Sequence, residues 1–301
     1  MRGKVKLKRT WLALPAVVVA AVFSITGVAT ASPASQSPGS TDYYLSLGDS
    51  LSVGFQPDAH GVGRPTDHGF DHDLLPGLRL VSLLHGRNLN LAELGCPSET
   101  TTTMINGGIC TYPHARSQLD AAITFLTQHR GHVPLVTISI GASDVEDCGS
   151  ATGIDAACLQ RGLADIQTNL TTIVTALKKA DPGTNTRFIG LNEYDPFLAA
   201  FLQGAAGQQL AMQSVTVVDQ LNKLLAAAYG QAGFRVADVA SAYRIDDFAD
   251  QTTLPGHGQV PVNVANLCKL TFECDPAPVG PNIHPRDSGY LTMAGAVAAK
   301  L

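Results

Sequence analysis

Short apolar runs alternate along the chain with longer stretches in which apolar residues recur every three or four positions. A short apolar run that ends near glycine predicts a buried strand, and the longer period predicts an amphipathic helix. The predicted strands span residues 43–47, 89–94, 135–140, 187–191 and 234–239. The predicted helices span residues 74–85, 118–129, 154–180, 208–230 and 288–301. This alternation predicts one parallel sheet covered by helices on both faces.

The N-terminal region predicts export. Residues 1–31 carry five basic side chains and no acid, and an apolar run over 11–29 ends in the sequence Ala-Thr-Ala. This is the order of a secretory signal peptide, cleaved after Ala31. The alternative is an uncleaved membrane anchor, since the run approaches the length that spans a bilayer. Its Pro, Ser, Thr and Gly residues and its small-residue ending favour cleavage.

The remaining chain predicts a single domain. Residues 32–41 are rich in Ser, Pro and Gly, which is typical of a flexible leader. Neither an internal repeat nor a second linker follows, so we expect residues 42–301 to fold as one domain. We therefore expect a secreted, extracellular monomer with no stable membrane anchor after cleavage.

The charge of the mature chain excludes one class of partner. The 301 residues include 20 Lys+Arg and 25 Asp+Glu, a net charge of −5. Removing residues 1–31 leaves 15 basic and 25 acidic side chains, a net charge of −10. Such an acidic body repels phosphate backbones, so we expect no nucleic-acid partner. Disorder is excluded as well, because 45% of residues are hydrophobic and only 15% are charged.

Six cysteines follow the predicted signal peptide: Cys96, Cys110, Cys148, Cys158, Cys268 and Cys274. An even number in an exported chain favours disulfides, and the spacing lacks the paired C-x-x-C pattern of zinc sites. Sequence alone does not choose among the possible pairings, but pairing of neighbours (96–110, 148–158 and 268–274) is the simplest. We expect no metal and no other cofactor.

Candidate chemistry lies where the predicted strands end, because ligands of parallel sheets bind outside the carboxyl ends of the strands. Gly48-Asp49-Ser50 follows the first strand, Gly95 the second, and Gly141-Ala142-Ser143-Asp144 the third. A serine on a tight strand-to-helix turn can present its hydroxyl and its backbone N–H to the same space. The alternative for Ser50 is a helix cap.

A serine nucleophile needs a base, which need not be close in sequence. His284 is our candidate, because Asn282-Ile283-His284-Pro285 directly precedes the last helix; a surface-loop histidine is the alternative. His60, His68 and His72 belong to a polar loop rich in Asp. The last two have an i, i+4 spacing that could bind a metal, but we favour a solvated loop.

Four short blocks resemble those of the SGNH/GDSL hydrolases. They are Leu-Ser-Leu-Gly-Asp-Ser-Leu-Ser-Val-Gly at 45–54, Leu-Gly-Cys-Pro-Ser-Glu-Thr at 94–100, Ile-Gly-Ala-Ser-Asp-Val at 140–145, and His-Pro at 284–285. The blocks occur in the family's order and span the mature chain, and residues 95–110 resemble secreted actinobacterial members. The resemblance implies a flavodoxin-like three-layer α/β/α sandwich with a central parallel sheet. It also implies hydrolysis of carboxylic esters by an activated serine.

The resemblance assigns roles by position. It implies that Ser50 is the nucleophile and His284 the general base. The oxyanion hole would consist of the backbone N–H groups of Ser50 and Gly95 and the side chain of residue 143. The sequence departs from the family here, because Ser143 stands where the family has Asn.

The block around His284 departs as well. Pro281 stands where the family has the Asp that orients the histidine, and Arg286 replaces an Asn. We expect a backbone carbonyl near Pro281 to orient the imidazole instead, with Asp275 and Asp287 as alternatives.

These residues predict a secreted serine esterase or lipase that acts on small-molecule, lipid or acylated-carbohydrate esters. The departures at positions 143 and 281 leave a second hypothesis, a non-catalytic or weakly active binding protein that retains the fold. A metal-dependent hydrolase built on the three loop histidines is the least favoured. The sequence does not choose among acyl chains.

Overall fold

The computed structural model describes residues 40–150, 153–182 and 185–301, which belong to one compact unit extending from residue 39 to residue 301. The predicted signal peptide, and the leader up to residue 39, lie outside the described residues. Thr41, which we placed in the leader, is the first residue of strand β1. Within the described ranges, no helix is both long and apolar enough to cross a membrane.

The centre of the fold is a five-stranded parallel sheet. Its strands are β1 (Thr41–Gly48), β4 (Asn88–Glu93), β5 (Leu135–Ser139), β8 (Arg187–Leu191) and β9 (Arg235–Ala237). They lie in the order β4-β1-β5-β8-β9, which is the flavodoxin-like order of a doubly wound sheet. The winding reverses between β1 and β5. The predicted fold class is therefore confirmed, and each predicted strand agrees with an observed one to within two residues at either end.

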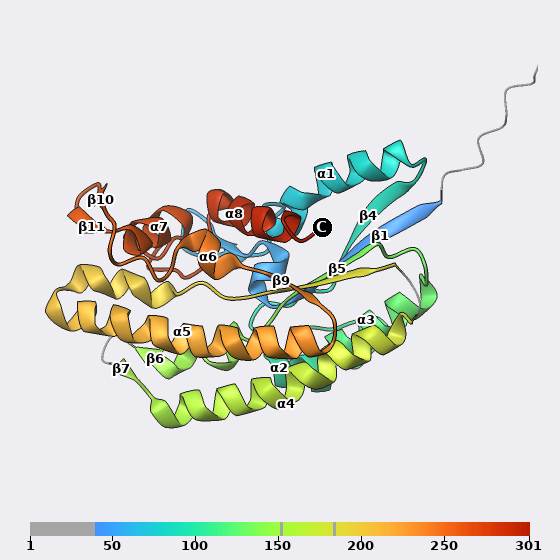
Figure 1. Cartoon of the computed structure of the whole chain (residues 1–301), viewed down its shortest axis with the longest axis horizontal. Coiled ribbons are helices and arrows are strands. Elements are labelled where there is room, and N and C mark those ends of the chain that lie inside the picture. Colours follow the sequence, from blue (N-terminus) through green and yellow to red (C-terminus); the bar gives the residue numbers. More distant parts are fainter. Residues whose placement is uncertain (1–39, 151–152, 183–184) are drawn as a thin grey trace, which may run out of the picture. The chain divides into compact units, whose positions relative to one another are not determined.

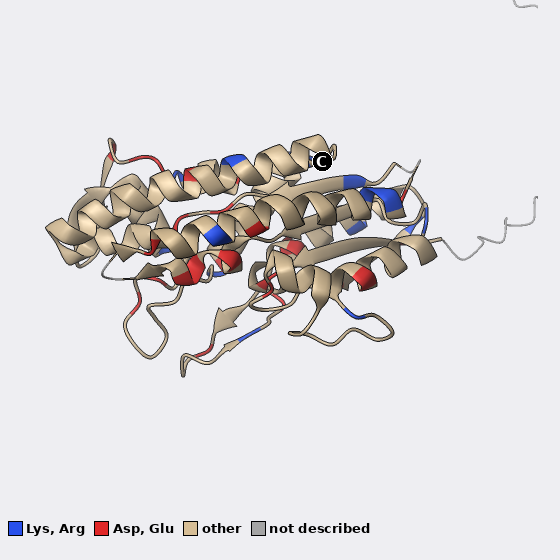
Figure 2. Ribbon diagram, turned by 90° about the horizontal axis from the view of Figure 1, so that it is seen from below, with Lys and Arg blue, Asp and Glu red and all other residues tan. Residues whose placement is uncertain are grey.

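Helices cover both faces of the sheet (Figure 1). One layer contains α1 (Phe70–Leu84), α6 (Val239–Tyr243), α7 (Val262–Leu270) and α8 (Asp287–Ala298). The other contains α2 (Thr101–Asn106), α3 (Gln118–Gln128), α4 (Ala156–Ala180) and α5 (Ala205–Gln231). Because side chains alternate along a strand, Tyr44 of β1 joins the core beneath α1 and α8, while Leu45 joins the core beneath α3 and α4. Charged residues are sparse on the long helices (Figure 2), in keeping with the low charged fraction.

Short elements were missed, because a few residues carry too little periodicity to be recognised. They include the 3-10 helices η1 (Ser50–Val53), η2 (Ala142–Asp144), η3 (Glu146–Cys148) and η4 (Pro196–Gln203), together with α2, α6 and α7. They also include the hairpins β2–β3 (Gln56–Pro57, Gly63–Arg64), β6–β7 (Gly149–Ser150, Gly153–Ile154) and β10–β11 (Gln251–Leu254, Gly258–Pro261). Helix α4 begins two residues later than predicted, because the Asp155 side chain caps it by accepting from the backbone N–H groups of Ala157 and Cys158.

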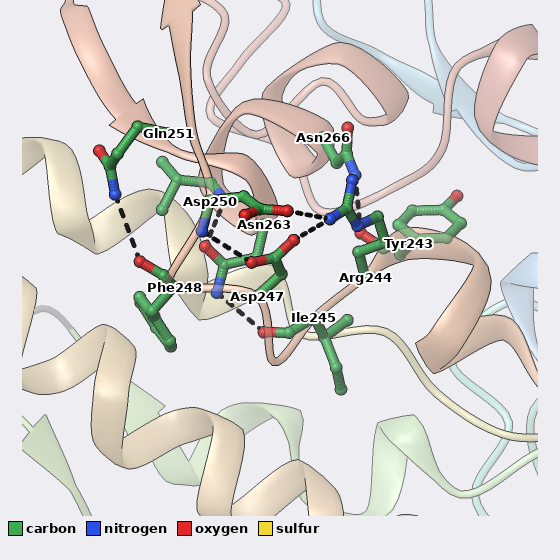
Figure 3. Close-up of polar contacts among 10 residues, drawn as sticks. Tyr243, Arg244, Ile245, Asp247, Phe248, Asp250, Gln251, Asn263 and Asn266 are labelled. Atoms are coloured by element: carbon green, nitrogen blue, oxygen red, sulfur yellow. Dashed lines mark hydrogen bonds and ion pairs between the residues drawn. The ribbon is translucent and has the colours of Figure 1, made fainter.

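The hairpin β10–β11 has a fixed base (Figure 3). Arg244 pairs with both Asp247 and Asp250, at 2.8 Å from the latter. Asn263, in the helix that follows the hairpin, donates to the backbone carbonyl of Ile245. The stretch 246–261 is thus tied to the body at both of its ends.

Three disulfides join sequence neighbours, as the simplest pairing predicted. They are Cys96–Cys110, Cys148–Cys158 and Cys268–Cys274, with Cα–Cα distances of 6.0, 5.4 and 5.0 Å. Each closes a loop of 6 to 14 residues, which on a chain-entropy argument stabilises the fold by roughly 2–3 kcal/mol.

Strand β1 ends in a turn that only glycine can make. Gly48 has a φ of +129°, and a Cβ atom there would overlap the carbonyl oxygen of Ser139 on β5. That oxygen accepts from the backbone N–H of Asp49 at 3.0 Å. On the other side, the Gln118 side chain accepts from the Gly48 N–H and donates to the Gly48 carbonyl, at 2.6 and 2.8 Å. The residue after Asp49 is consequently held at the carboxyl edge of the sheet.

We predict that Gly48→Ala lowers the free energy of unfolding by about 3 kcal/mol, because the methyl group meets a backbone that cannot yield. Urea denaturation measures the change. Gly295→Ala is the matched control: its Cβ meets nothing within 4 Å inside α8, so this variant should be neutral or slightly more stable. Equal stability of Gly48→Ala and the parent protein would contradict this account of the turn.

Candidate active site

Ser50 and His284 meet at the carboxyl edge of the sheet. Ser50 is the first residue of η1, directly after β1, and His284 lies in the loop between α7 and α8. The Nε2 atom of His284 lies 3.0 Å from Ser50 Oγ, although 234 residues separate the two in sequence. This is hydrogen-bonding distance for a nucleophile and its base.

The Asn282 side chain orients the imidazole. Its Oδ1 lies 2.9 Å from Nδ1 of His284, and it also accepts from the His284 backbone N–H at 3.0 Å. Because a backbone N–H can only donate, the accepting atom must be the carboxamide oxygen rather than its nitrogen. The same oxygen therefore requires a proton on Nδ1. The Nε2 lone pair is then left to accept the Ser50 hydroxyl proton.

This contact corrects one expectation. We expected a backbone carbonyl near Pro281, or else Asp275 or Asp287, to orient His284. Instead, Asp275 pairs with Arg286, and Asp287 accepts from Gln56. The sequence signal was an Asn two residues before the histidine. It was missed because the family pattern directs attention to the position three residues before it.

The loop that carries His284 is held on both sides. The hydroxyl of Tyr194 donates to the Ile283 carbonyl at 2.6 Å, and Gln56 Nε2 donates to the Pro285 carbonyl at 3.0 Å. The Phe55 ring lies against the imidazole, with centroids 4.8 Å apart. These contacts leave the imidazole little freedom to turn away from Ser50.

Burial keeps the imidazole uncharged. His284 is largely enclosed by protein, which disfavours the imidazolium and lowers its pKa to about 4. Asn282 is neutral and cannot offset this effect as a carboxylate would. At neutral pH the base is therefore present in its proton-accepting form.

Two backbone amides are available beside the hydroxyl. Gly95 follows β4, and a Cβ atom there would overlap Ser52 Oγ, so only glycine fits. Within the described ranges, neither the N–H of Ser50 nor that of Gly95 donates to a protein acceptor. Both are free to stabilise a developing negative charge.

Ser143 lines the same pocket as Ser50 and His284. It lies in η2, and its neighbour Asp144 anchors that turn by accepting from the backbone N–H and the hydroxyl of Thr101, at 2.8 and 2.7 Å. Among the described residues, the Ser143 hydroxyl has no hydrogen-bond partner. The backbone is therefore fixed while the hydroxyl can still rotate.

The pocket itself is narrow and mostly apolar, with a free volume of about 80 Å³. Its apolar walls come from η1, η3, α4, η4 and α5, and include Leu51, Val145, Leu159, Phe197, Val218 and Leu221. The disulfide residue Cys148 is also part of the wall. Most of this wall could not be found from sequence, because its residues come from many separate elements.

Three carboxyl groups belong to the pocket: Asp49, Glu146 and Glu193. Burial raises the pKa of Asp49, and the neighbouring Glu193 raises it further. The pKa of Glu193 is raised to about 8, mainly by burial and to a smaller extent by the nearby Glu146. These shifts favour the neutral forms of Asp49 and Glu193 and so lower the negative charge beside Ser50.

The histidines of the polar loop do not form the metal site that we considered. His68 faces Asp287 at 4.0 Å. In the part of the chain that the structure describes, the group of potential ligands gathered there is Asp71, His72 and Glu93, without His60 or His68.

Comparisons with known proteins identify the family of this chain. The family model "GDSL-like Lipase/Acylhydrolase family" matches residues 46–291. The chain belongs to this family. The matched range includes Ser50, Gly95, Ser143 and His284. A search of curated protein sequences found no significant match.

Several solved structures share the fold. An extracellular lipase from Streptomyces rimosus is 18% identical, with a TM-score of 0.53, 86% of this chain covered and 100% of the other. Phospholipase A1 from Streptomyces albidoflavus NA297 is 16% identical, with a TM-score of 0.53 and coverages of 86% and 99%. A GDSL-like lipase described as putative, from Parabacteroides merdae, is 12% identical, with a TM-score of 0.52 and coverages of 87% and 95%. At these identities the likeness concerns the fold.

We predict that Asn282→Asp raises the pKa of His284 by roughly 1–3 units, because a carboxylate at Nδ1 stabilises the imidazolium. An NMR titration of the imidazole C–H resonances measures the pKa in both proteins, without any substrate. The resonances of the other histidines serve as the internal control and should titrate alike in the two proteins. An unchanged His284 titration would show that Asn282 is not the partner of Nδ1.

Proposed function

We propose that this protein is a secreted serine esterase that hydrolyses carboxylic esters, with Ser50 as the nucleophile and His284 as the base. The observation that carries the proposal is the continuous chain from Ser50 Oγ through the imidazole to Asn282 Oδ1, at 3.0 and 2.9 Å. Family membership supports ester hydrolysis as the class of reaction.

The proposed reaction has two stages. His284 Nε2 accepts the Ser50 proton as Oγ attacks the ester carbonyl, and the imidazolium then gives this proton to the departing alcohol. Water, deprotonated by the same Nε2, attacks the acyl-enzyme in the second stage. The acid is released, and the proton returns to Ser50 Oγ. Asn282 keeps its hydrogen bond to Nδ1 throughout and remains uncharged.

The developing oxyanion would receive hydrogen bonds from the N–H groups of Ser50 and Gly95. Ser143 Oγ would be the third donor, in place of the family's Asn. A hydroxyl is shorter than a carboxamide and can rotate, so we expect this donor to contribute less than a fixed amide.

The apolar wall supports an ester with an apolar acyl group, which burial in the pocket would stabilise in proportion to the area removed from water. Small-molecule, lipid and acylated-carbohydrate esters all offer such groups. The lipase and the phospholipase A1 with similar folds support a lipid ester among these.

The disulfides and the N-terminal sequence support secretion. Disulfides form and persist in oxidising compartments, and three are present here. The basic and apolar segments of residues 1–31 have the order of a cleavable signal.

A binding protein without chemistry is the second candidate, motivated by the neutral Asn282 and by Ser143. The short contact between Ser50 and His284 argues against it, because a binding protein has no need to keep a nucleophile aligned with a neutral base.

We predict that Ser50→Ala abolishes hydrolysis of short-chain p-nitrophenyl esters, because no other group can form the acyl-enzyme. Initial rates and a circular dichroism spectrum measure activity and folding. Ser52 is too buried for Ser52→Ala to serve as a control. Ser288 is exposed, so Ser288→Ala is used instead and should keep full activity. Undiminished hydrolysis by Ser50→Ala would contradict the proposal.

We predict that Ser143→Asn raises kcat, because a carboxamide restores a fixed donor, and loss of one such donor costs on the order of 10²–10³ in turnover. Ser143→Ala, which has no donor, should lower kcat. Steady-state kinetics on the same ester compares the three proteins. A fall in kcat for Ser143→Asn would mean that the pocket is built around serine.

A further inference from the structure

A second group of chemically active side chains lies outside the pocket. Asp71 and His72 are in the first turn of α1, and Glu93 is the last residue of β4. One potential ligand atom from each lies within 4.8 Å of the other two. None of the three lines the pocket of Ser50 and His284.

Asp71 is buried, and in the described part of the chain only one of its two carboxylate oxygens accepts a hydrogen bond. It is 0% exposed, and its carboxylate accepts from the His72 backbone N–H at 2.9 Å through Oδ1. Oδ2 is buried and meets no donor among the described residues. One carboxylate oxygen of Asp71 and one of Glu93 lie within 4.8 Å of each other. Two ionised carboxylates this close repel each other, so a positive charge or a shared proton between them would stabilise the pair.

Neither a lysine nor an arginine is the source of this positive charge. Within the described ranges, no lysine or arginine forms an ion pair with Asp71 or Glu93. The group that approaches Glu93 is His72, whose Nε2 lies 3.5 Å from Glu93 Oε2. An imidazole nitrogen and two carboxylate oxygens thus lie within 4.8 Å of one another.

The backbone holds these side chains in place. Glu93 pairs with Ser46 in the ladder between β4 and β1. The Ser46 hydroxyl donates to the Ser52 carbonyl at 3.3 Å. The cluster therefore joins the start of α1 and the edge strand β4 to the turn that carries Ser50.

We propose that Asp71, His72 and Glu93 bind a divalent transition-metal ion of the Zn²⁺ class. One imidazole nitrogen with carboxylate oxygens suits Zn²⁺, whereas Mg²⁺ and Ca²⁺ prefer oxygen ligands alone. The His72 and Glu93 side chains are 25% and 34% exposed, which leaves a route for entry and room for water as a fourth ligand. The ion fastens α1 to β4; it takes no part in ester hydrolysis.

The test uses the mature protein without a histidine tag, freed of metal by a chelator. Titration calorimetry with ZnCl₂ should show binding of about one equivalent. At a hundredfold excess over Kd, thermal unfolding should shift upward by roughly 5 °C. MgCl₂ at the same concentration should produce neither effect. Because these readouts do not involve ester hydrolysis, they stand or fall independently of the proposed function.

Variants identify the ligands. His72→Gln and Glu93→Gln should each lower the Zn²⁺ affinity at least tenfold and remove the thermal shift. His68→Gln is the matched control, an exposed histidine four residues away, and should bind Zn²⁺ like the parent protein. Both ligand variants alter partly exposed side chains, so they should fold.

The competing explanation is a single proton shared by Asp71 and Glu93. In that case the parent protein binds no Zn²⁺, and Asp71→Asn, whose amide can donate to Glu93, is at least as stable as the parent. That result would overturn the proposal. Undiminished Zn²⁺ binding by both His72→Gln and Glu93→Gln would overturn it as well.

Discussion

One carboxamide oxygen determines the state of the candidate base. Asn282 Oδ1 accepts from the backbone N–H and from Nδ1 of the same residue, His284. The first hydrogen bond identifies the accepting atom as oxygen, and the second then specifies the tautomer. Without this oxygen, nothing in the loop would require the Nε2 lone pair to face Ser50.

A neutral partner has a consequence that a carboxylate would not have. A carboxylate at Nδ1 would stabilise the imidazolium and raise the pKa of His284, whereas Asn282 orients the ring without adding charge. Burial then dominates and lowers the pKa to about 4. The same burial raises the pKa of Glu193 to about 8. The environment of Ser50 therefore favours uncharged forms of its titratable neighbours, which suits a pocket with mainly apolar walls.

The sequence predicted the fold well because the strand and helix periods of hydrophobic residues extend over whole elements in this chain. The five central strands and the five long helices carry enough repeats to be recognised, and the disulfides join neighbours. The short elements and the hairpin β10–β11 depend on local contacts such as those of Arg244, which periodicity does not report.

The candidate site was predicted in part. Ser50, Gly95, Ser143 and His284 follow strand ends or precede the last helix, so their positions in the fold could be inferred. The partner of His284 could not be inferred. It depends on how the loop that joins the Cys268–Cys274 disulfide to the last helix folds back. Glu193 was missed for a similar reason: its place near Asp49 follows from the carboxyl ends of β1 and β8, the two strands that flank β5, and no local motif marks it.

We propose that Ser50 is a nucleophile activated by an imidazole that Asn282 orients. The most direct measurement is the rate of covalent labelling by a fluorophosphonate, followed by intact-mass analysis and peptide mapping. We expect one adduct per chain, at Ser50, formed much more slowly in Asn282→Ala with the fold unchanged. No adduct, or an adduct on another serine, would contradict it.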